Sequence, residues 1–322
     1  MKKREKIIWI DDNPDRLSTA RDLGASFVDV KGKDIAQVLR TLLENRSPQL
    51  VIIDHVLDKT AANTHPILLK GSTIAEGLKE KWPGCAVIGV TNAPNLTDID
   101  LRTKGTYDEL FPFQDFKKYF DRMSGIADGF ALLAKKRLTP RTLVELLKPP
   151  EDEVQRLLDA LNDDLKTRSQ DASSPSRTYR WVEGLLKRAG FLYDALWSAT
   201  FLGVNEAGFA KVADAFELAN YKGIFARPDD TRWWSGALAS ELYKLCSPQA
   251  GELSWHVGRR LPGIKKEHFS SCYYCKEDYP ETVAYLDVVS DERRAMHLKC
   301  TVPHPLHKRE LYFEDIRMMR GK

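Results

Sequence analysis

Short apolar runs separated by helical patterns set the strongest constraint on what the first third of this chain can fold into. The runs cover residues 7–10, 25–30, 50–53 and 86–90, with a weaker fifth run at residues 109–113. The helical patterns between them cover residues 14–23, 34–43 and 72–82. Near-continuous apolar strands alternating with helices are typical of a parallel sheet covered on both faces. We therefore expect an α/β domain with a doubly wound, five-stranded parallel sheet.

Polar side chains stand where three of these runs end. Asp11 and Asp12 follow the first run, Asp54 follows the third, and Thr91 follows the fourth. In an open α/β sheet, functional groups gather at the carboxyl ends of the strands. Three carboxylates meeting there would repel one another unless a cation neutralised them, and oxygen ligands of this kind suit Mg²⁺. A carboxylate beside Mg²⁺ can attack phosphorus and form an acyl phosphate.

Three segments with this order and spacing carry a family resemblance. They are Trp9–Pro14, Val51–Asp54 and Val87–Ala93. Residues of about 5–123 thereby resemble the response-regulator receiver family, a flavodoxin-like fold. The resemblance implies that Asp54 is the phosphate acceptor and that Asp11 and Asp12 help bind Mg²⁺. It further implies the backbone carbonyl of Val56 as an Mg²⁺ ligand and Thr91 as the phosphate-sensing hydroxyl.

The chain departs from this family's pattern in two places. The family carries a Lys-Pro pair after its last strand, in which the Lys pairs with the phosphate, whereas here Phe111 precedes Pro112. A phenylalanine cannot supply that cation, although Lys117 and Lys118 are near in sequence. Residues 58–70 also indicate an insertion, which suits a lid or a partner contact. A pseudo-receiver that docks a partner without being phosphorylated is therefore kept as an alternative.

A second cluster of metal-binding residue types lies at residues 272–300. Cys272 and Cys275 form a CxxC pair, and His297 and Cys300 form an HxxC pair. Two such pairs at this separation predict a four-coordinate structural Zn²⁺ site, with His304 as a rival ligand. A segment of about 60 residues has little core of its own, so that a bound metal would help it fold.

Length and composition suggest several domains in a cytoplasmic protein. We divide the 322 residues into a receiver domain at 1–124, a mostly helical middle domain at 125–262 and a small zinc-binding α+β unit at 263–322. Each part has one more Lys or Arg than Asp and Glu, so none is a basic module. Five cysteines, three of them clustered, do not resemble a secreted disulfide framework. Neither a membrane span nor a signal peptide is expected.

The middle domain carries weaker signals. Residues 143–165 can be read as a helix-turn-helix, but the second helix is strongly acidic and phosphate would repel it. We expect part of the Trp233–Trp234 pair to be exposed, because adjacent helix positions cannot both face one core. Arg259–Arg260 with Lys265–Lys266 is the notable basic cluster, and it is more typical of a solvated linker than of a nucleic-acid contact.

These observations predict an atypical two-component response regulator. A histidine kinase or phosphotransfer protein would phosphorylate Asp54, and the remainder would pass the signal to a downstream protein target, with homodimerisation left open. We expect no enzyme activity, because residues 125–322 lack a convincing nucleophile–base motif or a Gly-rich phosphate loop. A DNA-binding transcriptional regulator, with contacts from the zinc unit and residues 259–266, is the main alternative, and an output enzyme is the third.

Overall fold

The structure is a computed structural model in which contacts divide the chain into two compact units. One unit comprises residues 1–142 and 167–180, and the other comprises residues 143–166 and 181–322. The structure describes residues 6–33, 35–44, 47–57, 70–93, 99–114, 116–135, 139–167, 175–186, 190–227, 229–277, 281–287, 292–297 and 300. The insertion predicted after Asp54 and the rival ligand His304 lie outside these ranges. The division into three domains stays a prediction.

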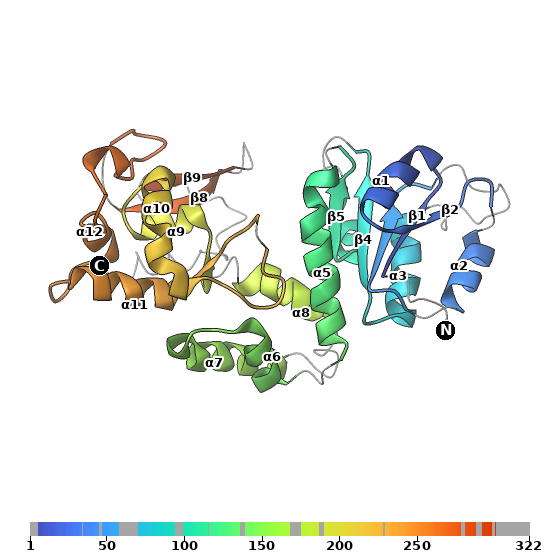
Figure 1. The fold of residues 1–322 in the computed structure, drawn as a ribbon, viewed down its shortest axis with the longest axis horizontal. Coiled ribbons are helices and arrows are strands. Elements are labelled where there is room, and N and C mark those ends of the chain that lie inside the picture. Colours follow the sequence, from blue (N-terminus) through green and yellow to red (C-terminus); the bar gives the residue numbers. More distant parts are fainter. Residues whose placement is uncertain are drawn as a thin grey trace. The chain divides into compact units, whose positions relative to one another are not determined.

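A five-stranded parallel sheet forms the centre of the first unit (Figure 1). Its strands are β1 (Ile7–Asp11), β2 (Ser26–Asp29), β3 (Leu50–Asp54), β4 (Ala86–Thr91) and β5 (Glu109–Pro112). They lie in the order β2-β1-β3-β4-β5, and every neighbouring pair is parallel. The predicted doubly wound sheet with a receiver-like strand order is thus confirmed. The order reverses between β1 and β3, which is where such sheets hold their functional groups.

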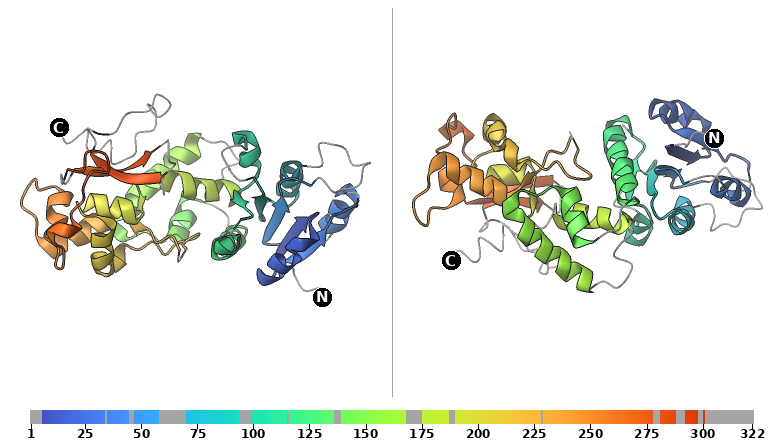
Figure 2. Two further views of the ribbon diagram at one scale, coloured as in Figure 1. Left: turned by 90° about the horizontal axis from the view of Figure 1, so that it is seen from above. Right: turned by 60° about the horizontal axis from the view of Figure 1, so that its bottom comes forward.

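Helices lie on both faces of this sheet (Figure 2). They are α1 (Leu17–Asp22), α2 (Ile35–Leu43), α3 (Gly71–Lys81), α4 (Leu101–Thr106) and α5 (Phe120–Leu133). A 3-10 turn, Pro14–Arg16, leads into α1, and the Asn13 side chain caps it by accepting a hydrogen bond from the Asp15 amide (3.1 Å). This turn brings the residues that follow Asp12 back over the end of β1.

Alternating side chains of the strands build an apolar layer on each face. On one face, Ile8, Ile10 and Ile53 are buried in a cluster with Ile74 and Leu78 of α3. Residues between these positions, such as Trp9 and Ile52, point the opposite way and are also fully buried. Burial of one such aliphatic side chain contributes about 1.5–3 kcal/mol. Both faces therefore hold β1 and β3 in place, together with the carboxylates at their ends.

The second unit is mostly helical and ends, within the described residues, in a β-hairpin. Its helices are α6 (Pro140–Leu147), which begins in the first unit, α7 (Glu151–Thr167), α9 (Ala195–Phe201), α10 (Glu206–Val212), α11 (Ser235–Cys246) and α12 (Ser254–Gly258). Helix α8 (Pro175–Trp181) belongs to the first unit except for its last residue. A π-helical turn covers Val182–Leu186, and 3-10 turns cover Ala213–Ala219 and Lys266–His268. The first unit has a further 3-10 turn at Phe116–Tyr119. Its strands are β6 (Leu192–Tyr193), β7 (Trp233–Trp234), β8 (Thr282–Asp287) and β9 (Glu292–His297). Nowhere in the described part of the chain does a helix have the length and apolarity that crossing a membrane requires.

The expected exposure of the Trp233–Trp234 pair is wrong, because both side chains are buried. The two residues do not belong to a helix; they form strand β7, which is antiparallel to β6. Successive side chains of a strand point to opposite sides. The ring of Trp233 therefore meets Phe209 (centroids 4.8 Å apart), while the ring of Trp234 meets Tyr221 (5.7 Å).

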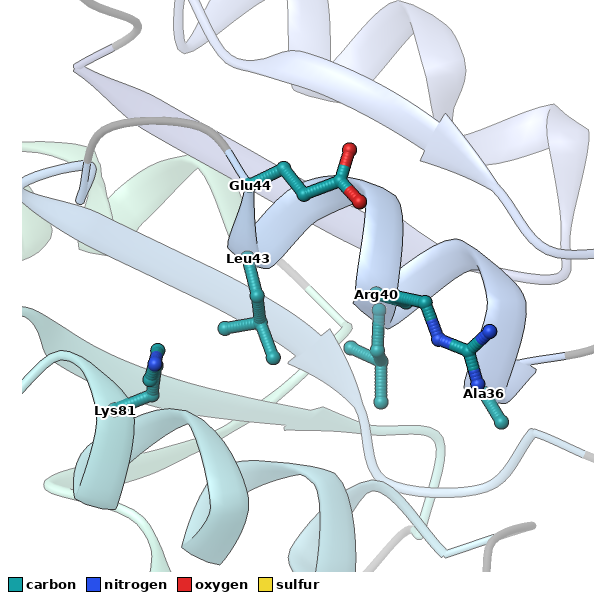
Figure 3. A pocket seen from close by; sticks show the side chains of 6 residues that line it. Ala36, Arg40, Leu43, Glu44 and Lys81 are labelled. Carbon is teal, nitrogen blue, oxygen red and sulfur yellow. The ribbon is translucent and has the colours of Figure 1, made fainter.

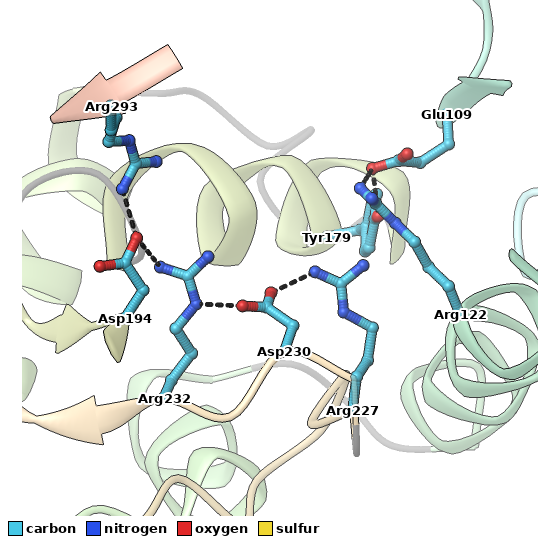
Figure 4. A network of polar contacts seen from close by, with 8 residues as sticks. All are labelled: Glu109, Arg122, Tyr179, Asp194, Arg227, Asp230, Arg232 and Arg293. Atoms are coloured by element: carbon cyan, nitrogen blue, oxygen red, sulfur yellow. Dashed lines mark hydrogen bonds and ion pairs between the residues drawn. The ribbon is translucent and has the colours of Figure 1, made fainter. Parts of the chain in front are cut away.

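A charged network joins the β8–β9 hairpin to the helices of this unit (Figure 4). Asp194 caps α9 by accepting a hydrogen bond from the Trp197 amide (2.8 Å), and its other oxygen binds Arg293 of β9 (2.5 Å) and Arg232 (3.5 Å). Trp197 also donates from its indole to the carbonyl of Ala284 in β8 (3.3 Å). These contacts fix the hairpin, and with it His297 at the end of β9, against α9.

Candidate functional site

The carboxylates at the ends of β1 and β3 lie together. One oxygen each from Asp11, Asp12 and Asp54 falls within a set whose members are all within 4.8 Å of one another. The three residues are almost completely buried, with Asp11 at 0%, Asp12 at 2% and Asp54 at 6% exposure. Such a spacing fits one divalent cation with oxygen ligands, because Mg²⁺–oxygen distances are about 2.0–2.1 Å. The donor set and the geometry therefore fit the cation that the sequence predicts.

The cationic side chain that meets these carboxylates is Arg16, which the sequence analysis missed. Its Nη1 lies 2.8 Å from Oδ2 of Asp11 and 3.1 Å from Oδ1 of Asp54, and the side chain is 2% exposed. The guanidinium carbon lies 4.4 Å from the ring centroid of Phe113, just beyond β5. The Trp9 indole completes the surroundings by donating to Oδ2 of Asp11 (3.0 Å). Asp11 is thus held by groups from both ends of the β1–α1 connection.

The environment of Asp54 opposes its ionisation. Burial is the main reason that the pKa of the Asp54 carboxyl is raised from 3.8 to about 7; the charges of Asp11 and Asp12 act in the same direction, and Arg16 acts against them. Desolvation and neighbouring carboxylates both disfavour a further negative charge. A cation bound by all three carboxylates would favour the ionised form of Asp54 and lower its pKa.

Close backbone contacts fix Asp54 and the residue after it. The His55 amide donates to the Val90 carbonyl (2.7 Å), which extends the pairing of β3 with β4, and the Gly71 amide donates to the His55 carbonyl (3.0 Å). A Cβ on Gly71 would lie 2.1 Å from the carbonyl oxygen of Asp54. Only glycine can therefore begin α3 at this distance from β3.

Thr91 and Val56, the other predicted site residues, lie near these backbone contacts. Thr91 ends β4, is 2% exposed, and accepts a hydrogen bond from the Ala93 amide at Oγ1 (3.0 Å). Val56 lies two residues past Asp54, in an isolated antiparallel bridge with Lys70, and its side chain is 53% exposed. Its carbonyl stays a predicted ligand.

A second contact joins the residue after β3 to the segment before β5. The imidazole Nδ1 of His55 lies 3.2 Å from the hydroxyl of Tyr107, whose ring is 1% exposed. Burial lowers the pKa of His55, and the charge of Lys70 lowers it further, so the imidazole is neutral near neutral pH. A Cβ on Gly89 would lie 2.9 Å from the Tyr107 ring, so the glycine in β4 leaves space for the tyrosine.

The residues after β5 do not take the place of the family's lysine. Phe111 is buried and stacks on Tyr119 (centroids 4.5 Å apart), and Lys117 pairs with the exposed Asp22 (2.5 Å). Lys118 lies over the ring of Tyr119, 5.1 Å from its centroid. The cation in the carboxylate site therefore comes from the β1–α1 connection and not from β5.

The groove of about 510 Å³ in Figure 3 lies away from these carboxylates, between α2 and the end of α3. Its lining residues are Ala36, Leu39, Arg40, Leu43, Glu44 and Lys81. It is an open surface hollow with mixed charges. Nothing among its lining residues suggests catalytic chemistry.

The cysteines and histidine predicted to bind zinc also lie together, in the second unit. One atom each from Cys272, Cys275, His297 and Cys300 belongs to a set within 4.8 Å of one another. Nδ1 of His297 lies 3.3 Å from the sulfur of Cys275 and 4.0 Å from that of Cys300. Tetrahedral zinc with bond lengths of about 2.3 Å to sulfur and 2.0–2.1 Å to nitrogen places its ligands at comparable separations. This Cys3His cluster can hold zinc.

Backbone amides around Cys272 favour its thiolate. Burial alone would raise the pKa of the Cys272 thiol, but hydrogen bonds from the amides of Cys275, His297 and Tyr274 outweigh it, and the pKa lies below its usual value. The His297 amide, for example, lies 3.4 Å from the sulfur. Since thiolates are the form that binds zinc, this arrangement suits a metal ligand.

The basic cluster at residues 259–266 is partly used inside the fold. Arg259 donates to the carbonyls of Gly203 (2.9 Å) and Ser270 (3.2 Å), and its guanidinium lies over the ring of Phe269. Arg260 pairs with Glu252 (2.8 Å). Two of the four basic side chains are therefore engaged within the chain, which weakens the case for a nucleic-acid contact through this cluster.

Comparisons with known proteins match the first part of the chain to solved structures. No family model and no curated protein matches. A signal receiver domain of an HD domain-containing protein from Pseudomonas fluorescens Pf-5 is 17% identical (TM-score 0.29), with 39% of this chain and 98% of that chain covered. A response regulator receiver domain protein from Clostridium thermocellum is 25% identical (TM-score 0.28; 37% and 93% covered).

A third similar structure is a response regulator protein from Burkholderia pseudomallei with a phosphorylated aspartic acid, a calcium ion and citrate. It is 14% identical, with a TM-score of 0.28, and the match covers 49% of this chain and 92% of that chain. These three solved structures are receiver domains or response regulators by their own description, and the five-stranded sheet of this chain has the order β2-β1-β3-β4-β5.

Proposed function

We propose that this chain is an atypical response regulator whose first unit accepts a phosphoryl group on Asp54. The observation that carries this proposal is the buried set of three carboxylates at the ends of β1 and β3. Arg16 is one positive charge beside three buried carboxylates, and buried negative charge in excess of its partners is costly. The same arrangement suits a site that binds a cation and a phosphorylated donor.

Each residue of the site has a proposed part in the transfer. Mg²⁺ would be held by Asp11, Asp12, Asp54 and the Val56 carbonyl, and it would neutralise the carboxylates and the phosphoryl oxygens. A carboxylate oxygen of Asp54 attacks phosphorus as the bond to the leaving group breaks, and the product is an acyl phosphate. The Thr91 hydroxyl oxygen accepts a hydrogen bond from the Ala93 amide, so its O–H can donate a hydrogen bond to a phosphoryl oxygen.

The donor is a histidine kinase or a phosphotransfer protein, and the output is an interaction with another protein without enzyme activity. The second unit, with Zn²⁺ held by the Cys3His cluster (Cys272, Cys275, His297 and Cys300), would present the surface for this interaction. The acidic first turn of α7 and the engaged Arg259 and Arg260 favour a protein target over DNA.

Intact-mass measurement after incubation with acetyl phosphate and Mg²⁺ tests the acceptor. We expect the parent to gain one phosphoryl group and Asp54→Asn to gain none. Asp15→Asn, at an exposed carboxylate beside the site, is the matched control and should behave as the parent. If the parent gains nothing from acetyl phosphate while Mg²⁺ binds, the acceptor role is wrong and the pseudo-receiver alternative takes its place.

A further inference from the structure

Arg16 is buried deeply for a charged side chain, and the reason lies in the groups around it. Its side chain is 2% exposed, and the nearest groups are the carboxylates of Asp11 and Asp54 and the ring of Phe113. A guanidinium does not lose its proton in a protein, so Arg16 carries a permanent positive charge in the site. The Phe113 ring lies against its carbon, which restricts how the planar group can rotate.

The guanidinium is not fully used by these partners. Nη1 contacts both carboxylates, but Nε is buried and makes no hydrogen bond to any residue that the structure describes. A buried donor of a charged group that lacks a partner is costly, so a ligand that accepts a hydrogen bond from it would be favoured. A tetrahedral phosphoryl group offers three acceptor oxygens and two negative charges, which suits the forked donors of arginine.

We propose that Arg16 binds the phosphoryl group on Asp54 and so supplies the cation that the residues after β5 do not. This inference rests on the proposed function, because it assigns a residue to the same transfer. Phe111 is packed against Tyr119, and Lys117 pairs with Asp22. Arg16 reaches Asp54 from the β1–α1 connection.

The transfer moves charge toward Arg16. With acetyl phosphate as the donor, an Asp54 oxygen forms a bond to phosphorus, the bond from phosphorus to the acetyl oxygen breaks, and acetate leaves with that electron pair. Asp54 changes from a carboxylate into an uncharged acyl group that carries a dianionic phosphoryl group. Arg16 Nη1 then exchanges Oδ1 of Asp54 for a phosphoryl oxygen and keeps its contact with Asp11. The guanidinium thus remains paired with the negative charge, which has moved from the Asp54 carboxylate to the phosphoryl group.

Three variants of the full-length protein test the assignment. Arg16→Met keeps the length of the side chain and removes its charge, Arg16→Lys keeps the charge without the fork, and Lys117→Met is the matched loss of an exposed lysine of the same unit. The readouts are initial phosphoryl uptake from acetyl phosphate by intact mass, and affinity for beryllofluoride, a phosphoryl mimic, in Mg²⁺. Mg²⁺ binding alone is measured by tryptophan fluorescence.

We expect Arg16→Met to lose at least tenfold in uptake rate and in beryllofluoride affinity. Its Mg²⁺ affinity should be unchanged or higher, because a positive charge 2.8 Å from Asp11 is removed. Arg16→Lys should recover part of both losses, and Lys117→Met should match the parent. If Arg16→Met does not fold, the assignment is tested on Arg16→Lys, for which we expect a severalfold loss of beryllofluoride affinity.

Two outcomes overturn the inference, and they can be told apart. Parent-like uptake and beryllofluoride affinity in the folded Arg16 variants would make Arg16 a structural counter-ion only. A parent that binds Mg²⁺ but takes up neither a phosphoryl group nor beryllofluoride would overturn the proposed function itself and, with it, this assignment.

Discussion

The indole of Trp9 donates a hydrogen bond to Asp11 Oδ2 across 3.0 Å inside the carboxylate site. Trp9 is fully buried, so we expect its emission to respond to charge around Asp11. A cation held by Asp11 would change the field at the indole. Mg²⁺ should therefore alter the fluorescence of the parent in a saturable titration.

Trp9→Phe identifies the source of that signal, because the chain has seven tryptophans. The variant should lose the Mg²⁺-dependent change while isothermal calorimetry still shows Mg²⁺ binding. Asp11→Asn should weaken Mg²⁺ binding at least tenfold, because one of the three carboxylate ligands is lost. A full signal in Trp9→Phe would mean that the cation acts on another part of the chain.

Asp54→Asn should make the magnesium-free protein more stable at alkaline pH. The pKa of Asp54 is about 7 in the folded state against 3.8 ordinarily, so the folded state holds a proton that the unfolded state has lost between these values. The free energy of unfolding of the parent therefore contains a contribution that is present at low pH and is lost as pH rises through about 7, on the order of 2–4 kcal/mol.

Urea unfolding of the two proteins at several pH values checks this sign. Their difference in free energy of unfolding should grow from about pH 4 to about pH 7 and stay constant above, with the variant more stable. Mg²⁺ should reduce the difference, since it stabilises only the parent's ionised carboxylate. A difference that does not vary with pH would show that Asp54 ionises normally.

Gly71→Ala should damage both the fold and the site. The added Cβ would lie 2.1 Å from the Asp54 carbonyl, so α3 must move away from β3. We expect a loss of stability of about 1–3 kcal/mol and weaker Mg²⁺ binding. Gly77→Ala in the same helix is the matched control, because its Cβ would meet nothing within 4 Å, and it should stabilise by about 0.5–1 kcal/mol. Equal stabilities in chemical denaturation would contradict the close approach.

Cys272→Ser should remove bound zinc and unfold the cluster around it. Zinc binding contributes about 10–16 kcal/mol to the folding of zinc-finger peptides at neutral pH, so loss of one thiolate is expected to be severe locally. Elemental analysis should give one zinc per parent chain and none in the variant, with a lowered thermal midpoint. Cys246→Ser, a cysteine outside the cluster, should keep its zinc. If Cys272→Ser retains its zinc, Cys272 is not a ligand and another residue must take its place.

The sheet was predictable from sequence because burial on both faces demands continuous apolar runs, such as Leu50–Ile53. The carboxylates were predictable because each follows one of those runs directly. Arg16 was not, since an arginine in the first turn of a helix is usually exposed, and its burial depends on Phe113, far along the chain. The Trp233–Trp234 pair was misjudged because a two-residue strand leaves no periodicity to read.

The contact of Tyr179 with Glu109 (2.7 Å between the hydroxyl and Oε1) has a consequence for dissecting the protein. Tyr179 lies in α8 and Glu109 in β5, and both belong to the first unit although residues 143–166 of the second unit come between them. The backbone therefore passes between the two units three times. A truncated protein that ends at residue 124 or 142 would lack α8. A single proteolytic cut could not separate the complete first unit from the second. Biochemical tests of the acceptor are better served by the uncut polypeptide.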